Sequence, residues 1–163
     1  MRLVGEASDE DGRQVVLTAY LPSLESWQEL AADAGWQEID EGFALFVAAD
    51  ASDVPVDVIA AFADWAIAHG MFWFSSWGPD CERVHDLVDA VDIGDGVSER
   101  DPIVMTTWHD SESLDDALFT FWWAFPSEGK QGGPFRLAVA VGEPRWQDAI
   151  ERIAEHHLAA MSE

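Results

Sequence analysis

The stretch MFWFSSWGPDCERVHD, residues 71–86, decides the fold. Its first half is a continuous apolar run, which is typical of a strand covered on both faces. Gly78 and Pro79 interrupt the run, and apolar positions three and four apart from Cys81 onward then predict a helix. The stretch IVMTTWHDSESL, residues 103–114, repeats the same order of strand, tryptophan, acids and helix start. Two strand–helix junctions of one kind indicate an α/β protein.

The rest of the chain keeps this rhythm. Residues 42–49 and 135–141 are further apolar strands, each followed by an amphipathic helix, and a turn at 9–12 predicts an N-terminal β-hairpin. We therefore expect one domain over residues 1–163, a three-layer α/β/α fold with a mostly parallel sheet of five to six strands, flavodoxin-like or Rossmann-like. An α+β fold with a mixed sheet is the alternative. The expected core includes the segments 44–48, 71–75, 103–107 and 136–141.

The motifs WGPDCERVHD (residues 77–86) and TTWHDSESLDDAL (residues 106–118) resemble the signature stretches of a family of small uncharacterised bacterial proteins, a domain of unknown function. The resemblance covers residues 71–126, and the remainder of the chain follows the family only in its strand–helix rhythm. The resemblance implies membership of this family. No established activity comes with it.

The acidity of the chain limits its partners. Thirty-two acids face eight bases, and the net charge is −24 at pH 7. Such a surface repels phosphate backbones, so we expect no direct binding of nucleic acid. Three interpretations stay open: ordinary surface charge in a GC-rich or salt-adapted organism, a docking face for a basic protein, or mimicry of nucleic acid. A basic protein is the partner class that the charge favours.

The sequence predicts a cytoplasmic protein without a membrane span. No apolar run approaches the ~20 residues that a spanning helix needs. The first residues turn acidic at once, unlike a signal peptide. The single cysteine, Cys81, excludes an internal disulfide and fits a reducing compartment.

Cys81 and His85 fall on one face of a predicted helix, at the carboxyl edge of the sheet where ligands of α/β folds bind. The thiol and the imidazole could meet at one metal, or His85 could activate Cys81 as a nucleophile. The structural alternative is a small core cysteine and a buried, hydrogen-bonded histidine. No dense metal signature accompanies the pair, and we expect neither a metal nor a cofactor.

The second junction places His109 beside two acids, where it could act as a general acid or base. The alternative is a turn residue that helps to cap the next helix. Because both junctions end strands at the same edge, we expect them to lie side by side, with His85 and His109 in one region. The tryptophans could wall a ligand pocket or simply plug the sheet edge. The catalytic candidates are His85, His109, Cys81 and Asp80, and the ligand-binding candidates are Trp77, Trp108, Asp110 and Glu112.

The sequence favours a non-catalytic binding or inhibitory protein, of the immunity or regulatory type, because it is small, acidic and without a complete catalytic signature. The alternative is a small hydrolase or transferase with a His, Cys and acid site at the carboxyl edge, so whether the protein is an enzyme stays open. A structural scaffold is a third class. The helix over residues 114–125 is apolar nearly all round, so we also expect a homodimer contact through Trp122 and Trp123.

Overall fold

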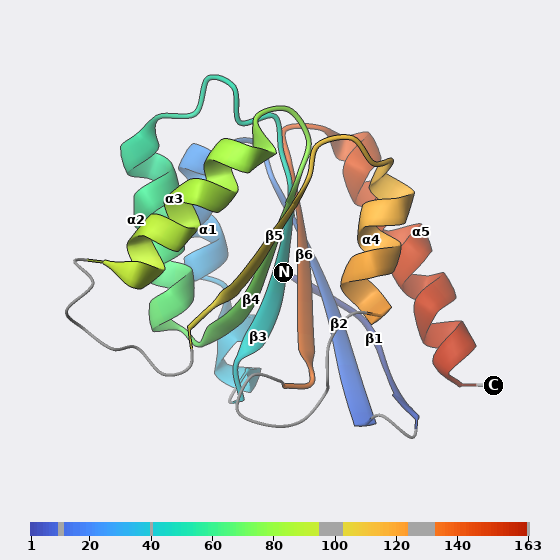
Figure 1. Ribbon diagram of the computed structural model, residues 1–163. Coiled ribbons are helices and arrows are strands. Elements are labelled where there is room, and N and C mark those ends of the chain that lie inside the picture. The colour runs from blue at the N-terminus through green and yellow to red at the C-terminus, as the bar shows by residue number, and fades with distance from the viewer. Residues whose placement is uncertain (10–11, 40, 95–102, 124–132, 163) are drawn as a thin grey trace.

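Six strands form one sheet in the computed structural model, which describes residues 1–9, 12–39, 41–94, 103–123 and 133–162 (Figure 1). The strands are β1 (Arg2–Asp9), β2 (Gly12–Leu21), β3 (Phe43–Ala48), β4 (Met71–Trp77), β5 (Met105–His109) and β6 (Phe135–Val141). Their order is β1-β2-β6-β3-β4-β5; β1 is antiparallel to β2, and all other neighbours are parallel. The predicted mostly parallel sheet and the N-terminal hairpin are confirmed.

Helices cover both faces of this sheet. They are α1 (Trp27–Ala31), α2 (Val56–Ala68), α3 (Cys81–Ile93), α4 (Leu114–Trp123) and α5 (Pro144–Met161), with the short 3₁₀ helices η1 (Leu24–Ser26) and η2 (Ala34–Glu38). Figure 1 shows α1, α2 and α3 on one side, here called the α2 face, and α4 and α5 on the other, the α5 face. The three layers are those that the sequence predicts. No helix in the described part of the chain is long and apolar enough to cross a membrane.

The strand order follows from the direction of the crossovers. From β2 through β3 and β4 to β5 the chain advances one way across the sheet, and the connecting helices lie on the α2 face. The connection from β5 to β6 runs back, so a crossover of the same hand must place α4 on the α5 face. β6 thereby enters between β2 and β3, an order that differs from both the flavodoxin and the Rossmann orders.

The β5 strand lies at the edge of the sheet, and this corrects one part of the expected core. Met105 and Trp108 are 41% and 43% exposed, and within the segment 103–107 only Val104 is buried. A strand with one neighbour leaves side chains at the rim of the sheet. The other three segments are buried as expected, apart from the half-buried Trp73.

Trp122 and Trp123 lie in different environments, so only the Trp122 part of the expected homodimer contact is corrected. Trp122 is 1% exposed and packs in the core of the α5 face, close to His157 of α5. A second copy of the folded protein therefore cannot reach it. Trp123 is 50% exposed, and its ring centroid lies 6.2 Å from that of Phe119.

Candidate functional site at the carboxyl edge

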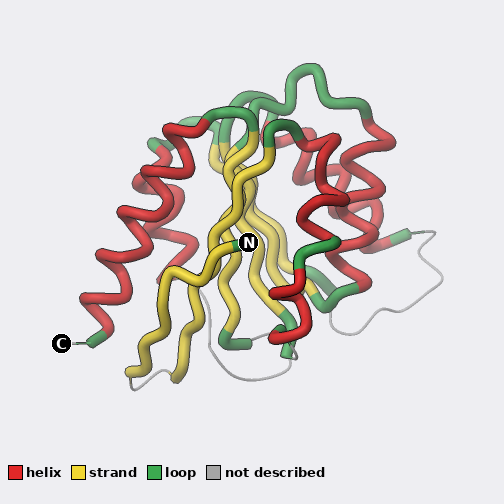
Figure 2. The backbone as a smooth tube through the Cα atoms, turned by 180° about the vertical axis from the view of Figure 1, so that it is seen from behind, coloured by secondary structure: helices red, strands yellow, loops and turns green. Residues whose placement is uncertain are grey.

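The turns that follow the parallel strands gather at one edge of the sheet, the carboxyl edge (Figure 2). A crevice opens there between neighbouring strands whose helices leave to opposite faces. β4 leads to α3 on the α2 face, whereas its neighbour β5 leads to α4 on the α5 face. Likewise β6 lies between β2 and β3 in the sheet. It leads to α5 on the α5 face, whereas β2 and β3 both lead to helices on the α2 face. The structure has a pocket at each of these two places.

The first pocket lies between the ends of β4 and β5, and we call it the His109 pocket. It has a volume of about 270 Å³ and is lined by Trp77, Gly78, Pro79, Asp80, His109, Asp110 and Glu112. Trp77 and His109 are direct partners in the register of β4 and β5. The two motif junctions therefore lie side by side, as the sequence predicts.

The backbone fixes the turn between β4 and α3. Gly78 has a φ of 110°, and a Cβ atom on it would lie 2.3 Å from the carbonyl oxygen of Ala49, so only glycine fits. Asp80 has a φ of 62°, and its carboxylate accepts a hydrogen bond from Arg83 Nε at 2.5 Å. Arg83 also donates to two carbonyls of the β3–α2 loop. Its guanidinium therefore ties this loop to α3.

His109 is 7% exposed and belongs to a chain of hydrogen bonds on the α5 face. Its Nδ1 atom lies 2.8 Å from Glu112 Oε2, and because a carboxylate only accepts, Nδ1 carries a proton. In the neutral imidazole Nε2 is then an acceptor, and it faces Thr107 Oγ1 at 3.5 Å. Thr107 Oγ1 lies 2.8 Å from Ser75 Oγ, which accepts from Trp73 Nε1 at 3.2 Å. With neutral His109, each group in this chain donates its hydrogen bond to the next one, from Trp73 through Ser75, Thr107 and His109 to Glu112.

His85 does not join His109. It lies on α3, over the α2 face, where its ring centroid is 4.5 Å from that of Trp108 and its Nδ1 atom is 3.1 Å from Asp86 Oδ1. His109 points to the α5 face, like its register partner Trp77. The expectation of one region for both histidines was wrong, because consecutive strand residues such as Trp108 and His109 point to opposite faces.

Cys81 is buried at the start of α3. It is 2% exposed, and burial raises the pKa of its thiol despite opposing backbone hydrogen bonds. A raised pKa lowers the thiolate fraction, so this environment favours a small core residue over a nucleophile. In the part of the chain that the structure describes, no group of three or more His, Cys, Asp or Glu side chains is placed to hold a metal ion.

The second pocket lies where β2, β6 and β3 end, and we call it the Trp146 pocket. It has a volume of about 220 Å³ and is lined by Pro22, Ser23, Leu24, Asp50, Val54, Val141, Gly142, Glu143 and Trp146. Trp146 meets Trp77 of the His109 pocket edge to face, with ring centroids 5.4 Å apart. Trp77 Nε1 also donates to the carbonyl of Glu112 at 2.9 Å. The tryptophan pair thus forms a fixed wall between the two pockets.

Both pockets are lined in part by carboxylates. Among the residues that the structure describes, neither lining includes a lysine or an arginine. Arg145 lies nearby but is 78% exposed and pairs with Glu143 at 3.2 Å. Hydrogen bonds from Ser52 hold the pKa of Asp50 below its usual value, so this carboxylate stays ionised. The lining acids are Asp50, Asp80, Asp110, Glu112 and Glu143.

Three residues of this edge were not among the site candidates predicted from the sequence: Ser75, Thr107 and Trp146. Ser75 and Thr107 alternate with the predicted residues Trp77 and His109, so pairing the two strands in register would have placed all four on one face. Trp146 had no comparable signal. It reaches the edge because β6 is inserted next to β3, which no local pattern announces.

Comparison with known proteins yields a family. No curated protein and no solved structure matches the chain. A family model described as a domain of unknown function (DUF7684) matches residues 23–157. This span starts after the β1–β2 hairpin and includes both junctions and both pocket-forming turns of β4 and β5. The chain belongs to this family, the DUF7684 domain of unknown function.

Proposed function

We propose that the protein is a non-catalytic binding protein that recognises a basic partner protein through the carboxyl edge of its sheet. The observation that carries this proposal is that the described residues lining both edge pockets include carboxylates but no lysine or arginine. These pockets sit where the strand order opens crevices, the usual ligand position in such sheets. Asp80 pairs with Arg83 and Glu143 with Arg145, but the other lining acids leave net negative charge at the edge. An anion would be repelled there, whereas a cation finds several acceptors.

Two further features suit a protein partner with exposed lysine or arginine side chains. The net charge of −24 would steer a basic protein toward the molecule and speed association. Trp77 and Trp146 offer indole rings beside the acids, and a cation over an indole ring gains cation–π stabilisation. Regulation or inhibition of the partner would follow from covering its basic surface.

The placement of the side chains predicted to be catalytic favours a binding protein over an enzyme. Cys81 is buried with a raised pKa, and the sheet lies between His85 and His109. A candidate base and nucleophile must come within hydrogen-bond reach of each other and of a substrate. The three do not meet in one pocket.

The proposal can be tested with fluorescein-labelled oligoarginine, followed by fluorescence anisotropy at low and high salt. Replacing Asp110 by Asn and Glu143 by Gln removes two edge charges, and Asp64→Asn with Glu155→Gln removes two exposed charges elsewhere. If each edge charge contributes about 0.5–1 kcal/mol, the edge variant binds roughly tenfold more weakly, while the control changes little. An equal loss in both variants would show that binding follows net charge alone, and would contradict an edge site.

A small hydrolase is the second candidate, and the Glu112–His109–Thr107 arrangement favours it. Glu112 orients the imidazole, and neutral Nε2 faces a hydroxyl, as in a serine-type triad. It ranks second because the Nε2 to Oγ1 distance of 3.5 Å is long and Thr107 lines neither edge pocket. Hydrolysis of p-nitrophenyl acetate by wild type, but not by a His109→Gln variant, would support it; equal rates would exclude it.

A further inference from the structure

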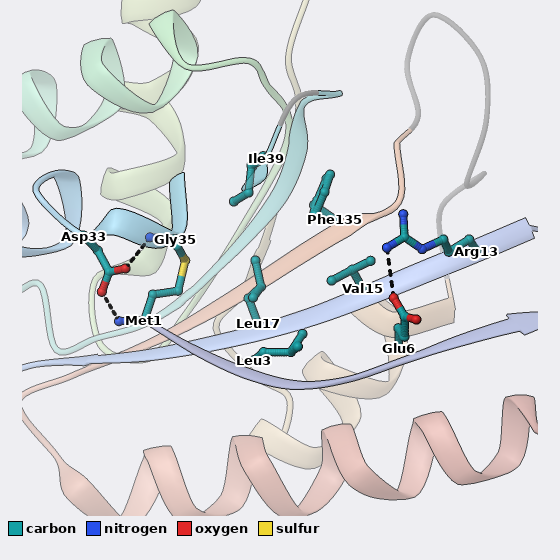
Figure 3. Close-up of a pocket in the computed structure, with 10 residues that line it drawn as sticks. All are labelled: Met1, Leu3, Glu6, Arg13, Val15, Leu17, Asp33, Gly35, Ile39 and Phe135. Carbon is teal, nitrogen blue, oxygen red and sulfur yellow. Dashed lines mark hydrogen bonds and ion pairs between the residues drawn. The ribbon is translucent and has the colours of Figure 1, made fainter. Parts of the chain in front are cut away.

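A third cavity lies on the α2 face of the β1–β2 hairpin, away from the carboxyl edge (Figure 3). Its volume is about 540 Å³, within the ~300–1,000 Å³ typical of small-molecule sites. Figure 3 shows apolar side chains of the two strands between two charged pairs, one at each end. The lining residues are Met1, Leu3, Glu6, Arg13, Val15, Leu17, Asp33, Gly35, Ile39 and Phe135.

The two faces of the hairpin are covered unequally: the long helix α5 packs on both strands on one face, whereas on the other face the short helix α1 packs on β2. On the α5 face, Arg2 and Gln14 bond to side chains of α5. On the α2 face, the described residues that border the cavity from outside the hairpin come from the η2 region and the start of β6. Val15 and Leu17 form a buried floor, whereas Leu3 is 57% exposed. A ligand with an apolar body would cover this exposed leucine.

One end of the cavity presents an ion pair that can exchange its partners. Arg13 Nη2 contacts Glu6 Oε2 at 2.9 Å, and the two side chains are 56% and 62% exposed. Such a pair contributes only about 0–1 kcal/mol. Among the described residues Glu6 is the one ion-pair partner of Arg13, and the rest of the guanidinium fork can bind a carboxylate in bidentate fashion. The second oxygen of Glu6 can accept from an ammonium group.

The charge of the whole molecule then selects the ligand class. A net charge of −24 repels any ligand that carries a net negative charge, even where one arginine could bind its carboxylate. A zwitterion feels no such net repulsion. It can give its carboxylate to Arg13 and its ammonium group to Glu6. The edge pockets do not offer this arrangement, because no lysine or arginine is among the described residues that line them.

We propose that this cavity binds a small zwitterion with an apolar body, of the size of a hydrophobic dipeptide. The carboxylate binds Arg13, the ammonium group binds Glu6, and the side chains lie on Leu3, Val15 and Leu17. This site is independent of the proposed carboxyl-edge function. Half of it belongs to the hairpin, which lies outside the span that the family model matches.

Isothermal titration calorimetry with the dipeptide leucyl-leucine tests the ligand class. The expected result is saturable binding with a Kd below about 1 mM. N-acetyl-leucyl-leucine lacks the ammonium group, leucyl-leucine amide lacks the carboxylate, and glycyl-glycine lacks the apolar body. Each should bind at least about tenfold more weakly, because each loses one of the three contacts. Absence of binding by leucyl-leucine, or equal binding of the three analogues, overturns the proposal.

Variants of exposed residues test the position without disturbing the core. Arg13→Gln should weaken leucyl-leucine at least about tenfold, and Leu3→Ser should weaken it severalfold. Arg152→Gln is the matched control, since Arg152 is 63% exposed and pairs with Asp115 on the far helices. If Arg13→Gln binds like Arg152→Gln, the ligand does not sit at this cavity and the proposal fails.

Discussion

Replacing Gly78 by alanine tests how the β4–α3 turn holds the His109 pocket. The left-handed φ of 110° costs a residue with a side chain about 1–2 kcal/mol. The new Cβ atom would also lie 2.3 Å from the Ala49 carbonyl oxygen, so β3 or β4 must shift. Overpacking of this kind costs about 1–3 kcal/mol, which gives a total of roughly 2–5 kcal/mol.

Gly94→Ala is the matched control. Gly94 also has a positive φ, 58°, but a Cβ atom there meets no described atom within 4 Å. It should therefore lose only the conformational part, about 1–3 kcal/mol for a sparsely populated backbone conformation. In thermal unfolding followed by circular dichroism, a chain of this length loses about 2–4 °C per kcal/mol. Equal losses of Tm in the two variants would refute the claim that contact with Ala49, rather than φ alone, requires glycine at position 78.

Three further predictions concern stability and reactivity. Trp122→Ala should lower the free energy of unfolding by about 3–5 kcal/mol and Trp123→Ala by less than about 1 kcal/mol, measured by urea denaturation, because only Trp122 is buried. The Cys81 thiol should react with a thiol reagent such as 5,5′-dithiobis(2-nitrobenzoic acid) only after unfolding, so rapid native labelling would contradict its burial. Burial alone would raise the pKa of Glu151, but hydrogen bonds led by that from Gln147 hold it below its ordinary value. A carboxyl group whose pKa is lower in the folded than in the unfolded protein stabilises the fold above its unfolded pKa of about 4.3, and this stabilisation is lost as the pH falls. The free energy of unfolding of Glu151→Gln should therefore fall less steeply with decreasing pH than that of wild type. An equal pH dependence of the two proteins would contradict this prediction.

Local patterns in the sequence predicted the elements well because burial acts on short segments. The continuous apolar runs of β3, β4 and β6 are buried between two helical layers, as a parallel sheet requires. The start of α4 is equally local, because the Asp116 N–H donates to Ser113 Oγ, three residues before it, at 3.1 Å. Each of these signals lies within a few residues of the structure that it specifies.

The misses concern features that depend on distant parts of the chain. The apolar rhythm of 135–141 gives no sign that its strand enters between β2 and β3. The apolar pattern also gives no sign that Arg136 is fully buried. Burial lowers the pKa of its guanidinium to about 10, and its Nη1 atom donates to the carbonyl of Gly133 at 2.5 Å. The prediction that His85 and His109 share one site was wrong. Helix periodicity placed His85 near the edge, but the face of the sheet on which His109 lies depends on how β5 pairs with β4.

The burial of His109 gives the molecule a spectroscopic reporter. Its Nδ1 proton is held by Glu112 in a side chain that is 7% exposed, so solvent exchange should be slow enough for the imidazole N–H to give an NMR signal. Both residues line the His109 pocket. A basic peptide that drew Glu112 away would shift or broaden this one resonance, so occupancy of the edge could be followed in the unlabelled protein, before any partner is known by name.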